Sequence, residues 1–403
     1  MSCLIEAGCM VDGLGGEPKE NVDILIDGQH IVAIGPRRSL PDVSAVVIPA
    51  HERMVLPGII DAHVHIGFDA SSDPAYTAKN QSPAEMTIHG VRNAHDLLAA
   101  GVTTIRTLGT PHHIDFFLRD GINNGLIQGP RLIAAGRGLT VTGGHGHYYR
   151  IEADGADEMR EATRDQIKAG AGVINITVTG GVITPGIRPG IPKFTFEEIQ
   201  AVVREAHKAG VRVAAHAEGK QGVNDALAAG IDSIEHGYFM NNDEGLDLLV
   251  ERGAYLVPTI MAYDLIANSG ERGVPAEAVE NARRALEYNT VGFRNAVDAG
   301  AKIAMGSDAG TAFNDHGRSW RELSFMVKNG MTPMHAIVAA TRNGAELLGL
   351  GEQLGTLEVG KLADIIVVDG DPLSDIAQIG NVTSVIKEGR IYKRDGILSS
   401  EMP

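Results

Sequence analysis

The first sign of chemistry in this chain is a pair of histidines, His63 and His65, at the end of an apolar stretch that follows Pro57 and Gly58. Residues 59–64 are mostly apolar and partly β-branched, which predicts a buried strand. Side chains two positions apart leave the same face of a strand, so both imidazoles can reach one metal ion. The pair alone is weak evidence, because two histidines on one strand face are more often only hydrogen-bonded.

Further residues of metal-binding type follow other apolar runs. His216 ends the run 211–216, His236 follows Glu235, and Asp308 stands in a Gly-Ser-Asp-Ala-Gly segment. Each has a simpler explanation: a hydrogen-bonded core histidine, a histidine placed by Glu235, and a helix N-cap. Because these residues and the first pair stand together at the ends of predicted strands, a shared metal site is favoured over packing.

The elements that position these residues repeat as helix, glycine and strand. A predicted helix at 82–100 leads through Gly101 into a β-rich run at 102–107, and the glycine is the left-handed helix stop. The same join recurs at Gly172, Gly210, Gly230, Gly253 and Gly300. Two further strands are predicted at 59–65 and 131–135, which brings the number of predicted strands to eight.

This alternation predicts an α/β fold, a (β/α)8 TIM-like barrel of parallel strands. An open, doubly wound sheet is the alternative, but no glycine-rich phosphate-binding motif follows the first strand. In a barrel the reactive groups gather at the C-terminal ends of the strands, because the loops there form the large concave face. Asn175 on the fourth strand shares this placement with the metal-binding residue types.

The two ends of the chain have a different pattern from the middle. Runs at 21–26 and 30–35 alternate polar and apolar residues around an Asp-Gly turn, and strands without helices resume after Leu357. We therefore expect a small composite β-sandwich domain built from residues 1–56 plus 357–403. The barrel then spans residues 57–356.

Composition excludes several classes of protein. The chain has 35 basic and 51 acidic residues, a net charge of −16, and no basic run, which argues against nucleic-acid or membrane partners. Its only cysteines, Cys3 and Cys9, cannot organise a disulfide framework. The first residues make a poor signal peptide, and no apolar run has the length of a membrane span. We expect a cytoplasmic enzyme that acts on a small molecule.

Several motifs together resemble the amidohydrolase superfamily, and within it the imidazolonepropionase-like and Xaa-Pro dipeptidase-like branch. The resemblance covers nearly the whole chain. It implies a TIM-like barrel with a composite β-sandwich, one or two divalent ions, usually Zn²⁺, and commonly a homo-oligomer. The motifs are LPGIIDAHVH, GVTTIRTLG, TVTGGHGHYY, NITVTGGVITPG, VAAHAEG, SIEHG, GSDAGTAFNDHG, ATRNGAELLGL and GTLEVGKLADIIVVDGDPL.

Carried over by position, the resemblance assigns metal roles to five residues. His63 and His65 match the first pair of metal ligands, and His216 and His236 match the second pair. Asp308 matches the aspartate that ligates metal and transfers the proton.

One position departs from the family pattern. Binuclear members commonly have a lysine in an I-K-I-x-x-T-G-G-V run, which is carboxylated to bridge two metals, whereas this chain has Asn175 there. An amide has no negative charge to balance two dications. We therefore expect one ion on His63, His65, His216 and Asp308, with His236 left to hold water or polarise the substrate. Two metals with Asn175 as a weak oxygen ligand, and an inactive ligand-binding relative, are the alternatives.

The expected reaction is hydrolysis by metal-activated water, with Asp308 as the proton acceptor and then donor, and His145 as a group that polarises the scissile carbonyl. The bond is expected to be a non-ring amide-type C–N bond, as in an N-acyl amino acid, dipeptide, amide, urea or carbamate. A cyclic-amide hydrolase or a deaminase is the alternative. Candidate substrate-binding residues in the same loops are His145, His147, Tyr148, Tyr149, Arg150, Arg188, Tyr238, Tyr263 and His316.

Overall fold

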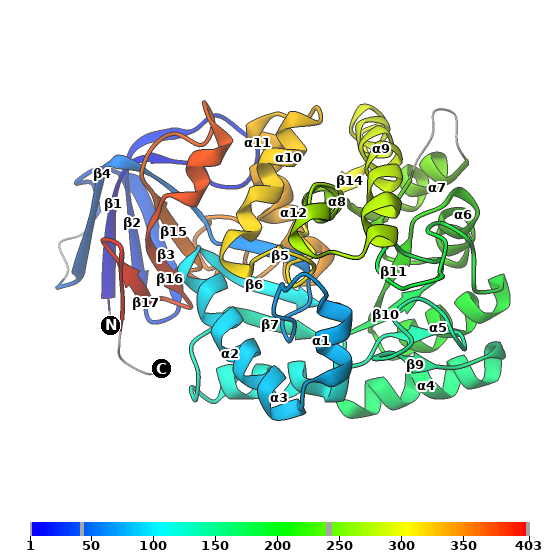
Figure 1. Ribbon diagram of the computed structural model, residues 1–403. Helices are drawn as coiled ribbons and strands as arrows, with labels where there is room; N and C mark the ends of the chain where they lie inside the picture. Colours follow the sequence, from blue (N-terminus) through cyan, green and yellow to red (C-terminus); the bar gives the residue numbers. More distant parts are fainter. Residues whose placement is uncertain (1, 41–43, 239–243, 400–403) are drawn as a thin grey trace.

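One sheet contains strands from both ends of the chain (Figure 1). The computed structural model describes residues 2–40, 44–238 and 244–399. The eight strands of this sheet run in the order β18-β17-β16-β15-β4-β1-β2-β3. Strand β4 pairs in parallel with β1 and antiparallel with β15, where Leu56 lies opposite Ile366. The strands are β1 (Ser2–Met10), β2 (Lys19–Asp27), β3 (His30–Pro36), β4 (Val46–Pro57), β15 (Ile365–Val368), β16 (Val382–Lys387), β17 (Arg390–Arg394) and β18 (Ile397–Leu398).

This sheet has an apolar core that draws on both chain ends. Ile5 and Ile24 come from the N-terminal strands, and Ile365 and Ile386 come from the C-terminal strands; all four are fully buried in one cluster. Burying an aliphatic side chain of this size contributes about 1.5–3 kcal/mol. The predicted strands at the two ends of the chain therefore stabilise each other.

The middle of the chain forms parallel strands between helices, which confirms the predicted α/β class. Every pairing among these strands is parallel. One set consists of β5 (Ile59–Val64), β6 (Val102–Thr107) and β7 (Arg131–Ala134). The other consists of β8 (Leu139–Thr140), β9 (Ile151–Glu152), β10 (Val173–Thr177), β11 (Arg212–Ala217), β12 (Ser233–His236), β13 (Tyr255–Val257) and β14 (Lys302–Ile303).

Main-chain hydrogen bonds connect the two sets at both margins. The N–H of Ala62 in β5 donates to Met305 O at 2.9 Å, just after β14. The N–H of Asp308 donates to His63 O at 2.8 Å. At the other margin, the N–H of Gly172 donates to Ala134 O in β7 at 2.8 Å. The ends of β5 and of the segment after β14 therefore lie side by side.

The helices pack outside the parallel strands, for example α2 against β6 and α5 against β11 (Figure 1). In α5 the buried residues Ile199, Val202, Val203 and Ala206 recur at helical spacing, and Thr195 and Glu198 form a capping box at its start. The helices are α1 (Pro74–Asn80), α2 (Pro83–Ala99), α3 (Ile114–Asn123), α4 (Gly155–Ala169), α5 (Phe196–Lys208), α6 (Lys220–Ala229), α7 (Glu244–Arg252), α8 (Ile260–Ala267), α9 (Ala276–Asp298), α10 (Glu322–Lys328), α11 (Pro333–Ala339) and α12 (Arg342–Leu347). In the described part of the chain, none of them has the length and apolar character needed to cross a bilayer.

One predicted helix stop is misplaced by two residues. Helix α4 ends at Ala169 and is capped by Gly170, which has a φ of 105°, whereas Gly172 was predicted to be the stop. Glycine adopts this left-handed conformation without steric cost, and Gly172 is instead engaged with β7 through its N–H. Left-handed φ values are found at the other predicted stops, Gly101, Gly210, Gly230, Gly253 and Gly300.

Candidate metal centre and active-site cavity

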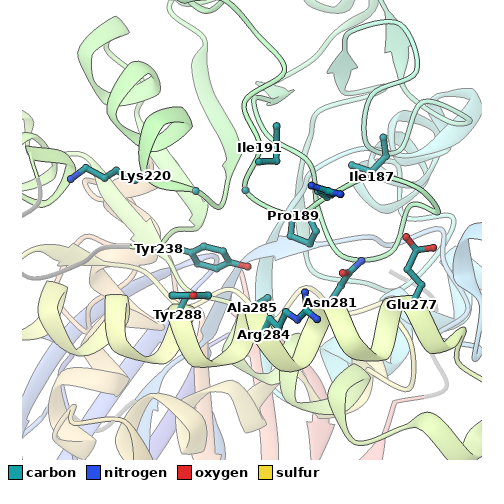
Figure 2. Close-up of a pocket in the computed structure, with 13 residues that line it drawn as sticks. Ile187, Pro189, Ile191, Lys220, Tyr238, Glu277, Asn281, Arg284, Ala285 and Tyr288 are labelled. Carbon is teal, nitrogen blue, oxygen red and sulfur yellow. The ribbon is translucent and has the colours of Figure 1, made fainter.

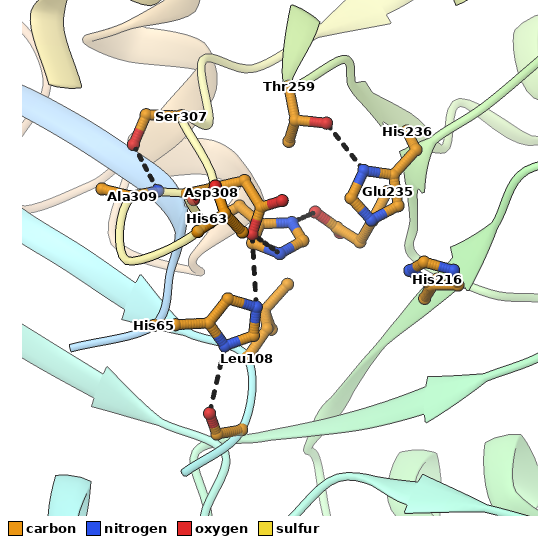
Figure 3. A network of polar contacts seen from close by, with 12 residues as sticks. His63, His65, Leu108, His216, Glu235, His236, Thr259, Ser307, Asp308 and Ala309 are labelled. Carbon is orange, nitrogen blue, oxygen red and sulfur yellow. Dashed lines mark hydrogen bonds and ion pairs between the residues drawn. The ribbon is translucent and has the colours of Figure 1, made fainter. Parts of the chain in front are cut away.

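Three of the predicted ligands form a compact, buried group (Figure 3). One ligand atom from each of His63, His65 and Asp308 lies within 4.8 Å of the other two. Asp308 Oδ1 is 3.3 Å from His63 Nε2 and 3.2 Å from His65 Nε2. The expectation that the two histidines at the end of β5 share a face is therefore confirmed, and the loop after β14 adds the carboxylate.

Both histidines of this group are held through Nδ1. His63 Nδ1 is 2.8 Å from Glu235 Oε2, and His65 Nδ1 is 3.1 Å from Gly109 O. These oxygens only accept, so each Nδ1 donates and each Nε2 is directed at Asp308. Glu235 is fixed in turn by Arg106 Nη2 at 2.7 Å. The sequence suggested that Glu235 could place His236; this is wrong, since its partner is His63.

The arrangement fits a cation, as its unpaired acceptors show. With Nδ1 protonated, each Nε2 presents a lone pair to Asp308 Oδ1, and a divalent cation satisfies all three acceptors at once. Among the described residues, Asp308 Oδ1, His216 Nε2 and Asn175 Oδ1 are buried without a hydrogen-bond partner. Although burial lowers it, the adjacent carboxylates of Asp308 and Glu235 raise the pKa of His63 to about 9, so the position between Nε2 and Asp308 favours either a proton or a metal ion. The site therefore attracts positive charge.

His216 and His236 lie next to this group at the ends of β11 and β12. The ring centroids of His216 and His236 are 4.5 Å apart, and those of His63 and His236 are 5.2 Å apart. His236 Nδ1 is 2.6 Å from Thr259 Oγ1, which leaves Nε2 facing the other rings. Burial lowers the pKa of His236 to about 3 and that of His216 well below its usual value. Both imidazoles are therefore neutral, which is the form that binds metal.

The backbone at two of these residues is strained. Asp308 has a φ of 57° and His236 a φ of 75°, in the left-handed region that non-glycine residues adopt at a cost of order 1–3 kcal/mol. Buried Asp61 holds the loop before Asp308, because its carboxylate accepts from Ser307 N at 3.0 Å and Ser307 Oγ at 2.5 Å. The fold thus maintains a conformation that brings the Asp308 carboxylate to the histidines.

These side chains line one small cavity of about 40 Å³. Asn175 enters it from β10; its Nδ2 donates to Leu108 O at 2.5 Å. His145 stacks on His216 at 4.8 Å, and its Nδ1 is 2.8 Å from Thr184 Oγ1. The lining residues include His63, His65, His145, Tyr149, Arg150, Asn175, His216, Glu218, His236, Tyr263 and Asp308.

A larger groove of about 780 Å³ lies between the 187–191 loop and helix α9 (Figure 2). Arg188 and Tyr238, two of the predicted substrate-binding residues, line it together with Tyr288. Its volume is within the range of sites that bind small organic molecules, roughly 300–1,000 Å³. Tyr238 also stands 6.5 Å, centroid to centroid, from Tyr263, which lines the inner cavity.

Three predicted substrate-binding residues are not among the lining residues of either space. His147 Nδ1 is 3.1 Å from Gly144 O, and Tyr148 is half-buried beside it. His316 is buried, and its Nε2 donates to His65 O at 3.2 Å, so it contacts the main chain behind a candidate ligand. In the same loop Tyr149, rather than Tyr148, lines the inner cavity.

Several residues that hold the site together were not predicted from the sequence. Arg106 is a charged residue inside an apolar strand run, and this unusual placement could have indicated a role for it. Glu218 stands two positions after His216, is 1% exposed, and accepts from the Tyr263 hydroxyl at 2.7 Å. Thr184 and Thr259, which contact His145 and His236, gave no signal, since threonine is common in loops and strands.

The chain is similar to known proteins in both sequence and structure. The sequence pattern of the Amidohydrolase family matches residues 54–392. The chain is 30% identical to ochratoxinase of Aspergillus niger, over 98% of this chain and 87% of the relative. It also resembles a crystal structure of a Xaa-Pro dipeptidase with methionine bound in the active site, with a TM-score of 0.90 and 37% identity over 98% of this chain and 100% of the other. Imidazolonepropionase of Sphingopyxis alaskensis is 25% identical over 88% of each chain.

The chain therefore belongs to the amidohydrolase family and is an enzyme of that hydrolase class. The family resemblance predicted from the motifs is confirmed.

Proposed function

We propose that this enzyme hydrolyses a non-ring amide-type C–N bond in a small molecule, such as an N-acyl amino acid, dipeptide, amide, urea or carbamate. The observation that carries the proposal is the buried His63, His65 and Asp308 group, which opens into the same cavity as His145. The similarity to a Xaa-Pro dipeptidase with bound methionine supports an acyl derivative of an amino acid. A cyclic-amide hydrolase or a deaminase is the second candidate, which the neutral Asn175 favours.

The proposed scaffold is a closed (β/α)8 barrel of residues 57–356, with a composite β-sandwich domain of residues 1–56 and 357–403. Main-chain hydrogen bonds between the segment after β14 and β5 support closure. The separate apolar core of the mixed sheet supports the second domain.

The proposed cofactor is one divalent ion, Zn²⁺ by preference, held by His63, His65, His216 and Asp308. When bound, such an ion polarises a carbonyl and makes water a stronger acid. Asn175 contributes an uncharged oxygen, which supports one ion over two. Two ions with Asn175 as a weak ligand are the alternative.

The protein side chains have distinct parts in the proposed reaction. The Asp308 carboxylate uses the oxygen that does not face the two histidines, Oδ2, to accept a proton from the attacking water and return it to the leaving nitrogen. Thr184 Oγ1 accepts from Gly146 N at 3.0 Å, so its own hydrogen is free to be donated to His145 Nδ1. His145 Nε2 then carries the hydrogen that can be donated to the substrate carbonyl oxygen. Burial, together with the charge of Arg150, lowers the pKa of His145 to about 3 and keeps this tautomer neutral.

A substrate panel tests the proposal. N-acyl amino acids, dipeptides, anilides, ureas, carbamates and cyclic amides are supplied to protein loaded with Zn²⁺, Co²⁺ or Mn²⁺, and product release is followed by mass spectrometry. We expect turnover of acyclic amides that His63→Ala abolishes. Turnover restricted to cyclic amides or amino-heterocycles would establish the second candidate, and no turnover with any metal would refute both.

A further inference from the structure

The inner cavity contains a buried cation for which the proposed hydrolysis provides no substrate contact. Arg150 is 3% exposed and lines the cavity with His145 and Asn175. Its Nη2 donates to the Tyr149 hydroxyl at 3.1 Å. Its Nε and Nη1 have no acceptor among the described residues. A guanidinium stays charged at all physiological pH values, so this charge is permanent.

The carboxyl groups that line the cavity do not pair with Arg150 in the described part of the chain. Asp308 faces His63 and His65, and Glu218 accepts from the Tyr263 hydroxyl. Across the described residues, no ion pair to Arg150 is formed. A buried cation without a partner is costly, and buried unpaired polar atoms in native proteins commonly mark a bound water or ion. The cavity is therefore complementary to an anion at Arg150.

The backbone around the guanidinium makes room for it. A Cβ atom on Gly138 would lie 2.2 Å from Arg150 Nη1, and one on Gly146 would lie 2.8 Å from Nε. The Tyr149 ring centroid lies 5.0 Å from Arg150 Cζ. Arg137 secures the same loop by donating to the carbonyl oxygen of Arg150 at 2.6 Å. Two glycines and an aromatic ring therefore determine where the Arg150 guanidinium lies.

We propose that Arg150 binds a carboxylate group of the substrate, so that the substrate class is an N-acyl amino acid or dipeptide with a free carboxylate. This inference rests on the proposed amide hydrolysis and narrows it. Neutral anilides, ureas and carbamates lack the group that Arg150 needs. Free bicarbonate is a planar oxyanion like a carboxylate and could also bind Arg150. The experiment distinguishes bicarbonate from a carboxylate of the substrate.

The test compares matched substrates. For the best N-acyl amino acid in the panel, kcat/KM is measured beside that of its C-terminal amide, which lacks only the negative charge. Truncating one partner of a buried charge pair costs 2–5 kcal/mol, which corresponds to a preference for the carboxylate of roughly 30-fold or more. We expect Arg150→Met to bring this ratio close to one and Arg150→Lys to give an intermediate ratio.

Two further variants control for structure. Gly138→Ala leaves Arg150 in the sequence but places a methyl group where Nη1 lies, so it should reduce the same ratio. Arg164→Met removes an exposed arginine of α4 that pairs with Glu205, and it should leave the ratio at the wild-type value. If Arg150→Met fails to fold, Gly138→Ala and Arg150→Lys still decide the question.

Each outcome bears on a different proposal. Wild-type protein that turns over the neutral amide as well as the acid overturns the role of Arg150 and leaves amide hydrolysis intact. If no substrate is turned over, hydrolysis is refuted, and calorimetric titration of metal-loaded protein with the same acid and amide measures the preference directly. Binding of bicarbonate that depends on Arg150, with no preference between acid and amide, identifies a free anion and overturns the substrate assignment.

Discussion

Glu235 Oε2 lies 2.8 Å from His63 Nδ1, and both side chains are buried. Glu235 Oε1 is bound by Arg106 Nη2 and by the Ser233 hydroxyl, at 2.7 and 2.6 Å. A carboxylate in this position fixes the orientation of the ring and raises the basicity of its other nitrogen. The Glu235 carboxylate thus determines how well His63 can serve as a ligand.

The first prediction follows from that contact. Glu235→Gln keeps a hydrogen-bonding group of the same size but removes the charge, so metal affinity should fall by about 10–100-fold. Competition with a fluorescent chelator measures this affinity. As a matched control, Glu205→Gln alters an exposed ion pair on α5 and should leave affinity unchanged. Equal affinities for Glu235→Gln and the parent protein would contradict the proposed role of His63.

Removal of metal should destabilise the protein. A ligand present at 100 times its Kd stabilises the folded state by about 2.7 kcal/mol, so extraction with a chelator should lower the melting temperature by several degrees. Re-addition of Zn²⁺ should restore it with a stoichiometry close to one ion per chain by elemental analysis. Two tightly held ions per chain would overturn the single-metal proposal.

Position 175 should control the number of metals. Asn175→Lys introduces an amine that can form a carbamate with bicarbonate, and a carbamate can bridge two cations. We expect a second ion per chain in bicarbonate buffer only, as measured by elemental analysis and anomalous diffraction. Asn175→Met has similar bulk without the amine and should retain one ion. An unchanged stoichiometry for the lysine variant would count against the bridging account.

His145 should affect turnover without affecting metal content. Replacing it with Leu removes the hydrogen that Nε2 directs at the substrate, and loss of one such donor costs about 10²–10³-fold in kcat. Thr184→Val should cause a smaller decrease, because it only releases the ring from its preferred tautomer. Steady-state kinetics with parallel metal analysis measures both effects. A loss of metal in either variant would show that His145 acts on the metal site instead.

The parts of this site that could be predicted from sequence are those defined by local spacing. His63 and His65 share a strand face because they are two residues apart, and the helix–glycine–strand joins located the parallel strands. Asp308 was found because it follows the last such join. In each case the prediction depends on only a few residues that are neighbours in the sequence.

The remaining parts depend on contacts between distant segments. Arg106 and Glu235 are 129 residues apart in the sequence. Their ion pair forms only because the fold brings the side chains of β6 and β12 together. Arg150 looked like one of several loop residues, because its lack of a partner is visible only once Gly138 and Gly146 surround it. The helix stop was predicted at Gly172 instead of Gly170 because two nearby glycines are equally plausible by composition.

Strand β4 has a consequence for synthesis of the chain on the ribosome. Its neighbour β1 has already been made when β4 emerges, whereas β15, which pairs with its other edge, begins only at Ile365. At roughly 5–20 residues per second, translation of the intervening chain leaves this edge without its native partner for about 15–60 s. An open edge of apolar strand residues invites pairing with other nascent chains. The protein should therefore depend on chaperones more during translation than after release.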